Sequence, residues 1–269
     1  MPTLKRLCLL IVSGVNLSCA VSTPIMAADP PRQERTFNGE AGALVLSAQH
    51  LMGSEDHVTA LVWLQKAAAL PNLSAYEKSV IYQMQGSSFY ELDQYDNAVA
   101  AFDLAVSSGG LLPNERKTLR LNIAQLLIAE HRFEEGAILL EALYAEYPSL
   151  GTKITELLWQ SWSQAEQYDK ALPWAERWFN AASPKERKYY DVLNFLYKNL
   201  NMPIKRTDIV QKMIAIWPED ILLWQSWAAL LTQTGRAGEA DEINSILSQK
   251  ENFTPAEITQ RLLQTQKQP

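Results

Sequence analysis

The most constraining feature of this sequence is a spaced pattern of aromatic and small residues that recurs along most of its 269 residues. It is clearest between Tyr82 and Ala105, in the form Y-x3-G-x2-F-x5-Y-x2-A-x3-F-x2-A. A small residue follows five of the six expected turns, as Ala60, Ala98, Gly136, Ala171 and Ala240. Because a small side chain there lets two antiparallel helices touch, the pattern predicts helical hairpins that stack along the chain.

The units of this pattern begin near residues 41, 79, 117, 152, 187 and 221, so they are 34 to 38 residues apart. The pattern resembles the tetratricopeptide repeat (TPR), a helix-turn-helix unit of about 34 residues. The resemblance implies an all-α fold, a right-handed TPR superhelix or α-solenoid of about six helix-turn-helix repeats over residues 43–250. The fifth unit departs from the pattern because Pro203 lies in its turn and Arg206 occupies the alanine position.

Three residue pairs have the spacing of a capping box, in which Ser or Thr begins a helix and a Glu three residues later bonds back to it. They are Ser74 with Glu77, Ser183 with Glu186, and Thr254 with Glu257. The last pair begins an amphipathic segment, which we interpret as the capping helix that a solenoid needs at its end. We therefore expect residues 251–269 to form a C-terminal capping helix and a frayed tail.

The N-terminus has the pattern of a targeting segment. Lys5 and Arg6 precede an apolar run over residues 7–21. This run is shorter than the ~20 apolar residues that cross a bilayer, and it lies at the start of the chain. We predict a signal peptide over residues 1–28, hence a periplasmic location, followed by a flexible leader over residues 29–42.

Both cysteines of the chain, Cys8 and Cys19, fall within this predicted signal peptide. Asn16 occupies the position where lipoprotein signals usually carry leucine, which argues against lipid anchoring at Cys19. Removal of the signal peptide takes away Lys5 and Arg6, so the net charge changes from −6 to −8. A chain without cysteine suits an oxidising compartment, where a stray thiol is a liability.

Composition and motifs exclude several classes of function. A net charge of −6 and a pI near 5.2 argue against a nucleic-acid binder, which needs a basic face. The sequence contains no P-loop, G-x-S-x-G motif or dinucleotide fingerprint, so we expect a protein that is not an enzyme and has no cofactor. His50 falls on a helix and His57 in a turn, without the spacing of metal ligands, so we expect no metal.

Eight tryptophans would also suit a glycan-binding solenoid. The repeat register places five of them where one helix packs on another, so we expect core packing for Trp159, Trp162, Trp178, Trp224 and Trp227. The other three fall elsewhere and are expected to be partly exposed: Trp63, Trp174 and Trp217.

In solenoids of this kind the first helix of each unit lines the concave face. Reading its positions 2, 5, 9 and 12 gives these candidate partner-binding residues: Gln83, Tyr90, Gln125, Glu156, Gln160, Lys188, Asp191, Phe195, Lys198 and Gln225. Position nine is glutamine in three units, at Gln49, Gln125 and Gln160. Such a ladder could hydrogen-bond the backbone of an extended peptide, or glutamine is simply a good polar helix former on a wet face. Both interpretations stay open at this point.

Residues 77–247 are similar to a subgroup of bacterial TPR proteins found with TonB–ExbB–ExbD energy-transducing systems. The segments that carry this resemblance are residues 82–86, 95–98, 112–115, 121–126, 168–173 and 216–220. The resemblance implies a periplasmic scaffold, not an enzyme, that helps a TonB-type transducer to energise outer-membrane uptake of iron–siderophore complexes. Two alternatives remain: another envelope scaffold, for outer-membrane assembly, secretion or peptidoglycan machinery, and a glycan-binding solenoid.

The repeat alignment makes a prediction about Ala98, the small residue of the second unit. Ala98→Leu should overpack the contact between two helices and lower the free energy of unfolding by roughly 1–3 kcal/mol. Chemical denaturation of the parent and the variant, followed by far-UV circular dichroism, measures the difference. A variant as stable as the parent would contradict the alignment.

Overall fold

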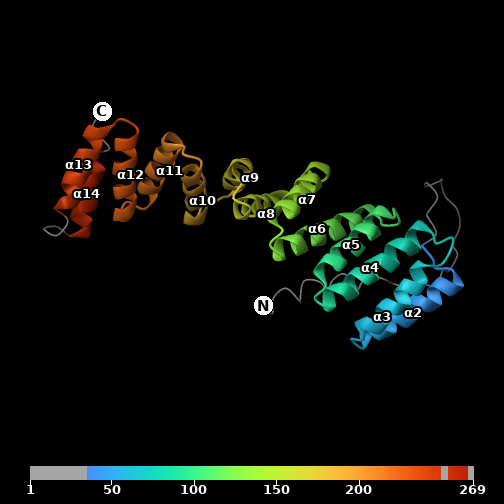
Figure 1. The fold of residues 1–269 in the computed structure, drawn as a ribbon. Helices are drawn as coiled ribbons and strands as arrows, with labels where there is room; N and C mark the ends of the chain where they lie inside the picture. Colours follow the sequence, from blue (N-terminus) through green and yellow to red (C-terminus); the bar gives the residue numbers. More distant parts are fainter. Residues whose placement is uncertain (1–34, 250–253, 266–269) are drawn as a thin grey trace. The chain divides into compact units, whose positions relative to one another are not determined.

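The computed structural model describes residues 35–249 and 254–265. All regular secondary structure in these residues is helical (Figure 1). The predicted signal peptide, with Cys8 and Cys19, lies outside the described residues. So do residues 250–253 and the last four residues of the chain.

The chain divides into two compact units, residues 1–146 and residues 147–269, and each is described by itself. The helices of the first unit are α2 (Gly39–Gly53), α3 (His57–Ala68), α4 (Ala75–Glu91), α5 (Tyr95–Ser107), α6 (Pro113–Ala129) and α7 (Phe133–Glu146). The second unit contains η1 (Pro148–Leu150), α8 (Gly151–Gln164), α9 (Tyr168–Ala181), α10 (Arg187–Asn199), α11 (Pro203–Ile216), α12 (Ile221–Gln233), α13 (Ala237–Ser248) and α14 (Pro255–Thr265).

Consecutive helices pair as antiparallel hairpins, and within each unit every hairpin packs on the next one along the chain. The first unit holds the hairpins α2–α3, α4–α5 and α6–α7, and the second holds α8–α9, α10–α11 and α12–α13. Helix α14 packs against α13 and buries Ile258 and Leu262. The predicted all-α solenoid of six helical hairpins with a C-terminal capping helix is therefore confirmed.

One backbone conformation closes all six hairpins. Each turn contains a residue with φ between 51° and 83°, namely Glu55, Asp93, His131, Glu166, Asn201 and Gly235. In the α4–α5 turn this lets the Asp93 N–H donate to the Tyr90 carbonyl at 3.0 Å. The Gln94 N–H donates to the Phe89 carbonyl at 2.9 Å. Only one of the six residues is glycine, so five turns accept a side chain in a left-handed conformation that costs roughly 1–2 kcal/mol per residue.

The small residue after each turn lies where the two helices of a hairpin touch. Ala60, Ala98, Ala171 and Ala240 are all fully buried. Gly136 occupies the same place in α7, and a Cβ atom there would lie 2.7 Å from the Ile128 side chain on α6. A larger side chain at these positions would force the helices apart, which is the physical basis of the repeat pattern.

Large and small residues exchange places between the second and fourth hairpins. In α4–α5 a Cβ atom on Gly86 would lie 2.5 Å from the ring of Phe102, so the glycine makes room for the aromatic ring. At the equivalent positions of α8–α9 the first helix carries Trp159 and the second carries Ala175, which is fully buried. The large residue of this pair of positions therefore lies on the second helix in α4–α5 and on the first helix in α8–α9.

The irregular fifth unit forms a hairpin in its own way. Pro203 begins α11, where the missing N–H of proline costs no hydrogen bond. Arg206, which stands at the alanine position, reaches across the hairpin and donates from Nε to Asn194 Oδ1 on α10 at 2.9 Å. A polar pair therefore replaces the contact that a small residue after the turn makes in the other hairpins.

Two of the three predicted capping boxes form. Ser74 and Glu77 cap α4 reciprocally, and the Thr254 N–H donates to Glu257 at 2.7 Å at the start of α14. The Ser183 box was wrong, because α10 begins only at Arg187 and no side chain caps it. The Glu186 carboxylate, predicted to bond back to Ser183, instead forms an ion pair with Lys188.

Part of the predicted leader is fixed to the first unit. The Arg35 guanidinium donates to both carboxylate oxygens of Glu115, at 2.8 and 2.9 Å, and lies over the Tyr76 ring at 4.9 Å. The ring of Phe37 lies 5.7 Å from the same Tyr76 ring. Helix α2 then begins at Gly39. Of the expected flexible leader over residues 29–42, residues 35–42 therefore belong to the folded unit.

Glu77 joins this segment to the start of α4. Its side chain is only 3% exposed, and its carboxylate accepts the Asn38 N–H and the Ser74 N–H, each at 2.7 Å. Burial by itself raises the pKa of Glu77, but the hydrogen bonds from Asn38 and Ser74 lower that pKa by more, so it lies below its usual value. One carboxylate thus satisfies amides at the beginnings of both α2 and α4.

Replacing this carboxylate should destabilise the first unit in a pH-dependent way. Because the folded pKa of Glu77 lies below the unfolded one, its contribution is complete above about pH 4.3 and is lost as the pH falls through the folded pKa. We expect Glu77→Gln to lower the free energy of unfolding by about 1–3 kcal/mol at pH 7. The difference from the parent should shrink as the pH falls toward 3.

Urea denaturation of parent and variant at a series of pH values measures this effect. Glu40→Gln, which changes an exposed carboxylate on α2, is the matched control and should alter the free energy by less than about 0.5 kcal/mol at every pH. A Glu77→Gln difference that stays constant from pH 7 to pH 3 would show that the charge of Glu77 does not stabilise the fold.

Candidate partner-binding site

The candidate residues of the first unit lie on its first helices. Gln83 on α4 and Gln125 on α6 are half-buried. Tyr90 differs from the prediction, because it is only 6% exposed and belongs to a core cluster with Ala98. Its ring also meets that of Tyr95 edge-on, with 5.7 Å between centroids. Tyr90 is a core residue because its position on the last turn of α4 faces the neighbouring helices instead of solvent.

The other seven candidates belong to the second unit, on the first helices of its hairpins. We call them the first-helix face: Glu156 and Gln160 on α8, Lys188, Asp191, Phe195 and Lys198 on α10, and Gln225 on α12. Six of them are exposed and Glu156 is half-buried. Gln160 and Phe195 occupy equivalent positions of successive hairpins, as do Glu156, Asp191 and Gln225. The three glutamines at position nine do not share a unit, since Gln49 and Gln125 belong to the first.

Charges at the beginning of α10 are paired. Arg187 contacts Asp191 at 3.7 Å and Asp220, which precedes α12, at 2.5 Å. Lys188 contacts Glu186 at 3.3 Å, and this hydrogen-bonded carboxylate raises the pKa of Lys188. These exposed pairs orient side chains and contribute little to stability. They leave the first-helix face close to electrically neutral.

Two large apolar side chains lie among these polar groups. Phe195 is 47% exposed, and its ring meets Tyr168 edge-on with 5.6 Å between centroids. Leu222, at the second position of α12, is 72% exposed. Leu222 was missed by the sequence analysis, although its register is the same as that of Lys188 and would have identified it.

The arrangement suits the binding of a peptide. Exposed amides on Gln160 and Gln225 offer donors and acceptors, and Phe195 offers an apolar contact, as the recognition of a peptide requires. In the described residues no three His, Cys, Asp or Glu side chains gather as metal ligands would. His50 and His57 are not part of such a group.

Four tryptophans lie in the core as predicted, since Trp162, Trp178, Trp224 and Trp227 are at most 5% exposed. Trp159 is half-buried, and its indole Nε1–H is buried without an acceptor in the described residues. The remaining three are half-buried, and each has a cation over its ring: Lys66 over Trp63, Arg177 over Trp174 and Arg187 over Trp217. A sugar could therefore stack on these rings only after displacing the cation or from the other side.

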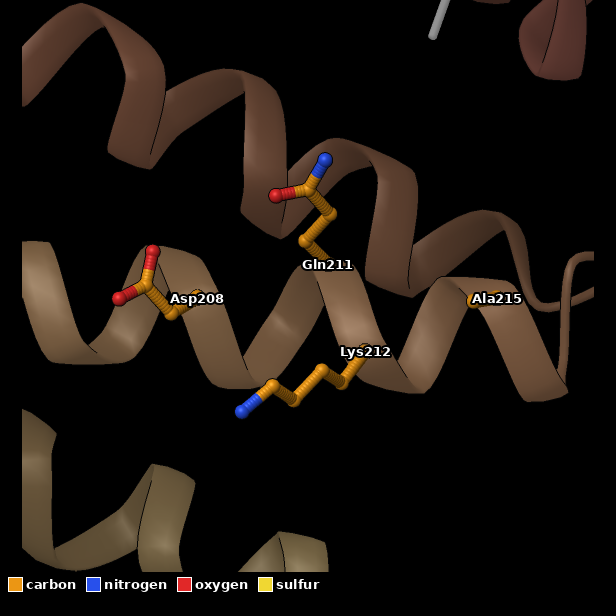
Figure 2. Close-up of a pocket in the computed structure, with 4 residues that line it drawn as sticks. All are labelled: Asp208, Gln211, Lys212 and Ala215. Carbon is orange, nitrogen blue, oxygen red and sulfur yellow. The ribbon is translucent and has the colours of Figure 1, made fainter.

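A shallow depression of about 350 Å³ lies on the second helix of the fifth hairpin. Figure 2 shows that all four of its lining residues, Asp208, Gln211, Lys212 and Ala215, come from successive turns of α11. All four are exposed, and none is a predicted candidate residue. A single exposed helix face does not enclose a small molecule, because ligand pockets bury most of the surface of what they bind.

None of the described helices is both long and apolar enough to cross a bilayer. No protein-family model and no curated protein matches the sequence.

Solved structures provide the comparisons. A tetratricopeptide repeat protein from Parabacteroides merdae ATCC 43184 is 16% identical, with a TM-score of 0.46 over 78% of this chain and 80% of that one. The MamA RS-1 ArsTM double mutant is 17% identical, with a TM-score of 0.45 over 67% of this chain and 96% of that one. A chain in the structure of Naa15/Naa10 bound to HypK-THB is 11% identical, with a TM-score of 0.58. That match covers 86% of this chain but only 34% of the other.

This chain has a TPR fold. At such low identity the likeness concerns the fold alone, and it agrees with the six hairpins, their small-residue contacts and their common turn. The TPR units here are the hairpins α2–α3 to α12–α13, with α14 as the final helix.

The burial of Tyr90 and the exposure of Gln160 make opposite predictions for the two candidates. Tyr90→Ala should lower the free energy of unfolding by about 3 kcal/mol, because it leaves a cavity in the first unit. Gln160→Ala should change it by less than about 0.5 kcal/mol, because it lies in solvent. Thermal and urea unfolding followed by circular dichroism measure both. If the Tyr90→Ala variant were as stable as the parent, Tyr90 would not be a core residue and would again be a candidate for partner binding.

Proposed function

We propose that this protein is a periplasmic protein–protein interaction scaffold without a catalytic centre, and an accessory component of a TonB-dependent system for iron uptake. The first-helix face of the second unit binds an extended segment of the protein partner. The observation that carries the proposal is the set of exposed polar and apolar side chains at equivalent positions of α8, α10 and α12.

The composition of this face favours a peptide over other ligands. Gln160 and Gln225 each present a donor and an acceptor, so they can bond either polarity of a peptide backbone. Phe195 and Leu222 are apolar and exposed in the free protein, so covering them stabilises a complex by about 25 cal/mol per Å² of buried surface. Because the charges near α10 are paired, the partner segment needs no strong charge of its own.

Support for the location and the system comes from the sequence. Lys5 and Arg6 followed by the apolar run of residues 7–21 favour export. The resemblance of residues 77–247 to TPR proteins found with TonB–ExbB–ExbD systems favours TonB, ExbB or ExbD as the partner. A scaffold for outer-membrane assembly, secretion or peptidoglycan machinery is the alternative, because TPR hairpins are alike across many functions.

Crosslinking in living cells tests the face and the partner together. A photo-crosslinking amino acid replaces Gln160 or Gln225 in the full chain, and mass spectrometry identifies the proteins captured. The matched control places the same amino acid at Asn180, an exposed position on the second helix α9. We expect TonB, ExbB or ExbD to be captured from Gln160 and Gln225 at least about tenfold more than from Asn180, because hot-spot contacts concentrate in one patch.

Other outcomes separate the parts of the proposal. Capture of assembly, secretion or peptidoglycan proteins from Gln160 and Gln225, without TonB, ExbB or ExbD, would support the first-helix face as the binding site. It would reject the TonB system as the source of the partner. Equal capture from Asn180 would reject the face itself.

A further inference from the structure

The second helices of the first unit leave a row of apolar side chains in solvent. Val62 on α3 is 46% exposed, Leu104 on α5 is 48% exposed, and Ile138 on α7 is 54% exposed. Val62 and Ile138 occupy the equivalent position of the first and third hairpins, and exposed Ala100 occupies it in the second. Leu104 lies one helical turn beyond Ala100. We call Val62, Ala100, Leu104 and Ile138 the apolar row.

Most of the charges on the helices that carry this row are acidic. Helix α3 contains one cation, Lys66, one turn beyond Val62, whereas α5 and α7 together contain no Lys or Arg and six carboxylates: Asp96, Asp103, Glu134, Glu135, Glu141 and Glu146. Of these, Glu146 is paired with Arg116 and Arg120 of α6. Arg132, just before α7, contacts Asp96 at 2.9 Å and Glu135 at 2.7 Å. One guanidinium between two carboxylates leaves that end of the row with a net negative charge.

Asp103 places an exposed carboxylate beside Leu104. Burial raises the pKa of Asp103, and the attraction of Arg132 lowers it by less, so the pKa lies above its usual value. The charged form of this carboxylate is therefore less stable than it would be in water. A further cation beside Asp103 would stabilise the charged form and would itself be attracted.

The charge of the whole chain is concentrated in this unit. Residues 1–146 contain 10 Lys and Arg against 16 Asp and Glu, whereas residues 147–269 contain 14 of each. The net charge of −6 therefore belongs entirely to the first unit, and removal of Lys5 and Arg6 would make it more negative. A field of one sign attracts partners of the opposite sign and accelerates their association.

We propose that the apolar row and its flanking carboxylates are a second docking surface, which binds a basic amphipathic helix of a partner protein. The apolar stripe of that helix covers Val62, Leu104 and Ile138, and its Lys or Arg residues lie against Asp103 and its acidic neighbours. This surface belongs to the first unit and does not depend on the peptide-binding face of the second.

We expect the partner segment to be helical, because the apolar row has no groups that could form hydrogen bonds with the backbone of an extended partner. Val62, Ala100, Leu104 and Ile138 have no polar side-chain atoms, and the backbone amides of α3, α5 and α7 are bonded within their own helices. An extended peptide would bury unsatisfied N–H and C=O groups there, at a cost of about 1–3 kcal/mol each, whereas a helix brings its backbone already paired.

Charge distinguishes this occupant from the two other candidates. A second copy of the chain would bring its own apolar row, but with the same negative charge, so the two faces repel. A membrane surface rich in anionic lipids is repelled for the same reason. Only a partner that combines apolar and basic side chains complements both features of the surface.

A peptide-binding experiment tests this surface with the full chain. The probe is a fluorescent peptide of about 20 residues made of Leu and Lys, with Leu at helical spacing on one side. Its control has the same composition with Leu distributed around the helix. We expect fluorescence anisotropy to give at least about tenfold tighter binding for the amphipathic peptide, and binding should weaken as salt rises from about 50 to 200 mM.

Matched variants of the chain locate the binding. Leu104→Gln with Ile138→Gln should weaken binding of the amphipathic peptide about tenfold, because it removes the apolar contact without adding charge. Asp103→Asn should weaken binding less and reduce its dependence on salt. Ile204→Gln with Ile216→Gln changes two residues of the second unit that are 71% and 48% exposed and lie outside both proposed binding surfaces, and it should leave binding unchanged.

Three results would overturn the proposal: no binding of the amphipathic peptide, equal binding of the control peptide, or undiminished binding by the Leu104 and Ile138 variant. Self-association of the parent that disappears in that variant would instead assign the row to a second copy. Circular dichroism and thermal unfolding confirm that each variant is folded, as expected for exposed positions. Because the probe is not a TonB-system protein, failure here is distinct from failure of the proposed function.

Discussion

The close contact between the two helices of each hairpin is the constraint on which the rest of this structure depends. Ala98 and Gly136 leave room for the facing helix, and a side chain added at Gly136 would overlap Ile128. The residues at this contact differ between hairpins. Trp159 and Ala175 stand at the positions of Gly86 and Phe102, and Arg206 bonds Asn194 where the other hairpins place a small residue after the turn.

Once the hairpins are formed, function depends on what their outer faces carry. The two units differ in this respect. In the second unit, amides and apolar side chains alternate on α8, α10 and α12, and Arg187 and Lys188 are paired with carboxylates. In the first, apolar residues on α3, α5 and α7 lie among carboxylates that exceed the available cations. One fold therefore presents two surfaces of different chemistry, and each suits a different kind of partner segment.

The fold was predictable from the sequence because its signals are local. The small residue after each turn, the aromatic spacing and the capping pairs of Ser74 and Thr254 all act within one hairpin. Local signals failed at two places. At the start of α10 the Glu186 carboxylate pairs with its near neighbour Lys188, and Ser183 does not cap the helix. Residues 35–38 are ordered by contacts with Tyr76, Glu77 and Glu115, which are far along the chain. Register alone also placed Tyr90 in solvent, where the structure buries it.

By itself the sequence determined the number of hairpins, their helical character and the identity of their contact residues, because each of these follows from spacing within about 34 residues. Which side chains reach solvent was decided only by the tertiary structure. Exposure depends on the neighbouring hairpin as well as on position within the repeat, so Tyr90 and Lys198, which share position 12 of their units, have opposite outcomes: Tyr90 is buried and Lys198 is exposed. The apolar row has the same origin, because its residues lie on three helices, α3, α5 and α7, that are separated in sequence and are brought together only when the hairpins stack.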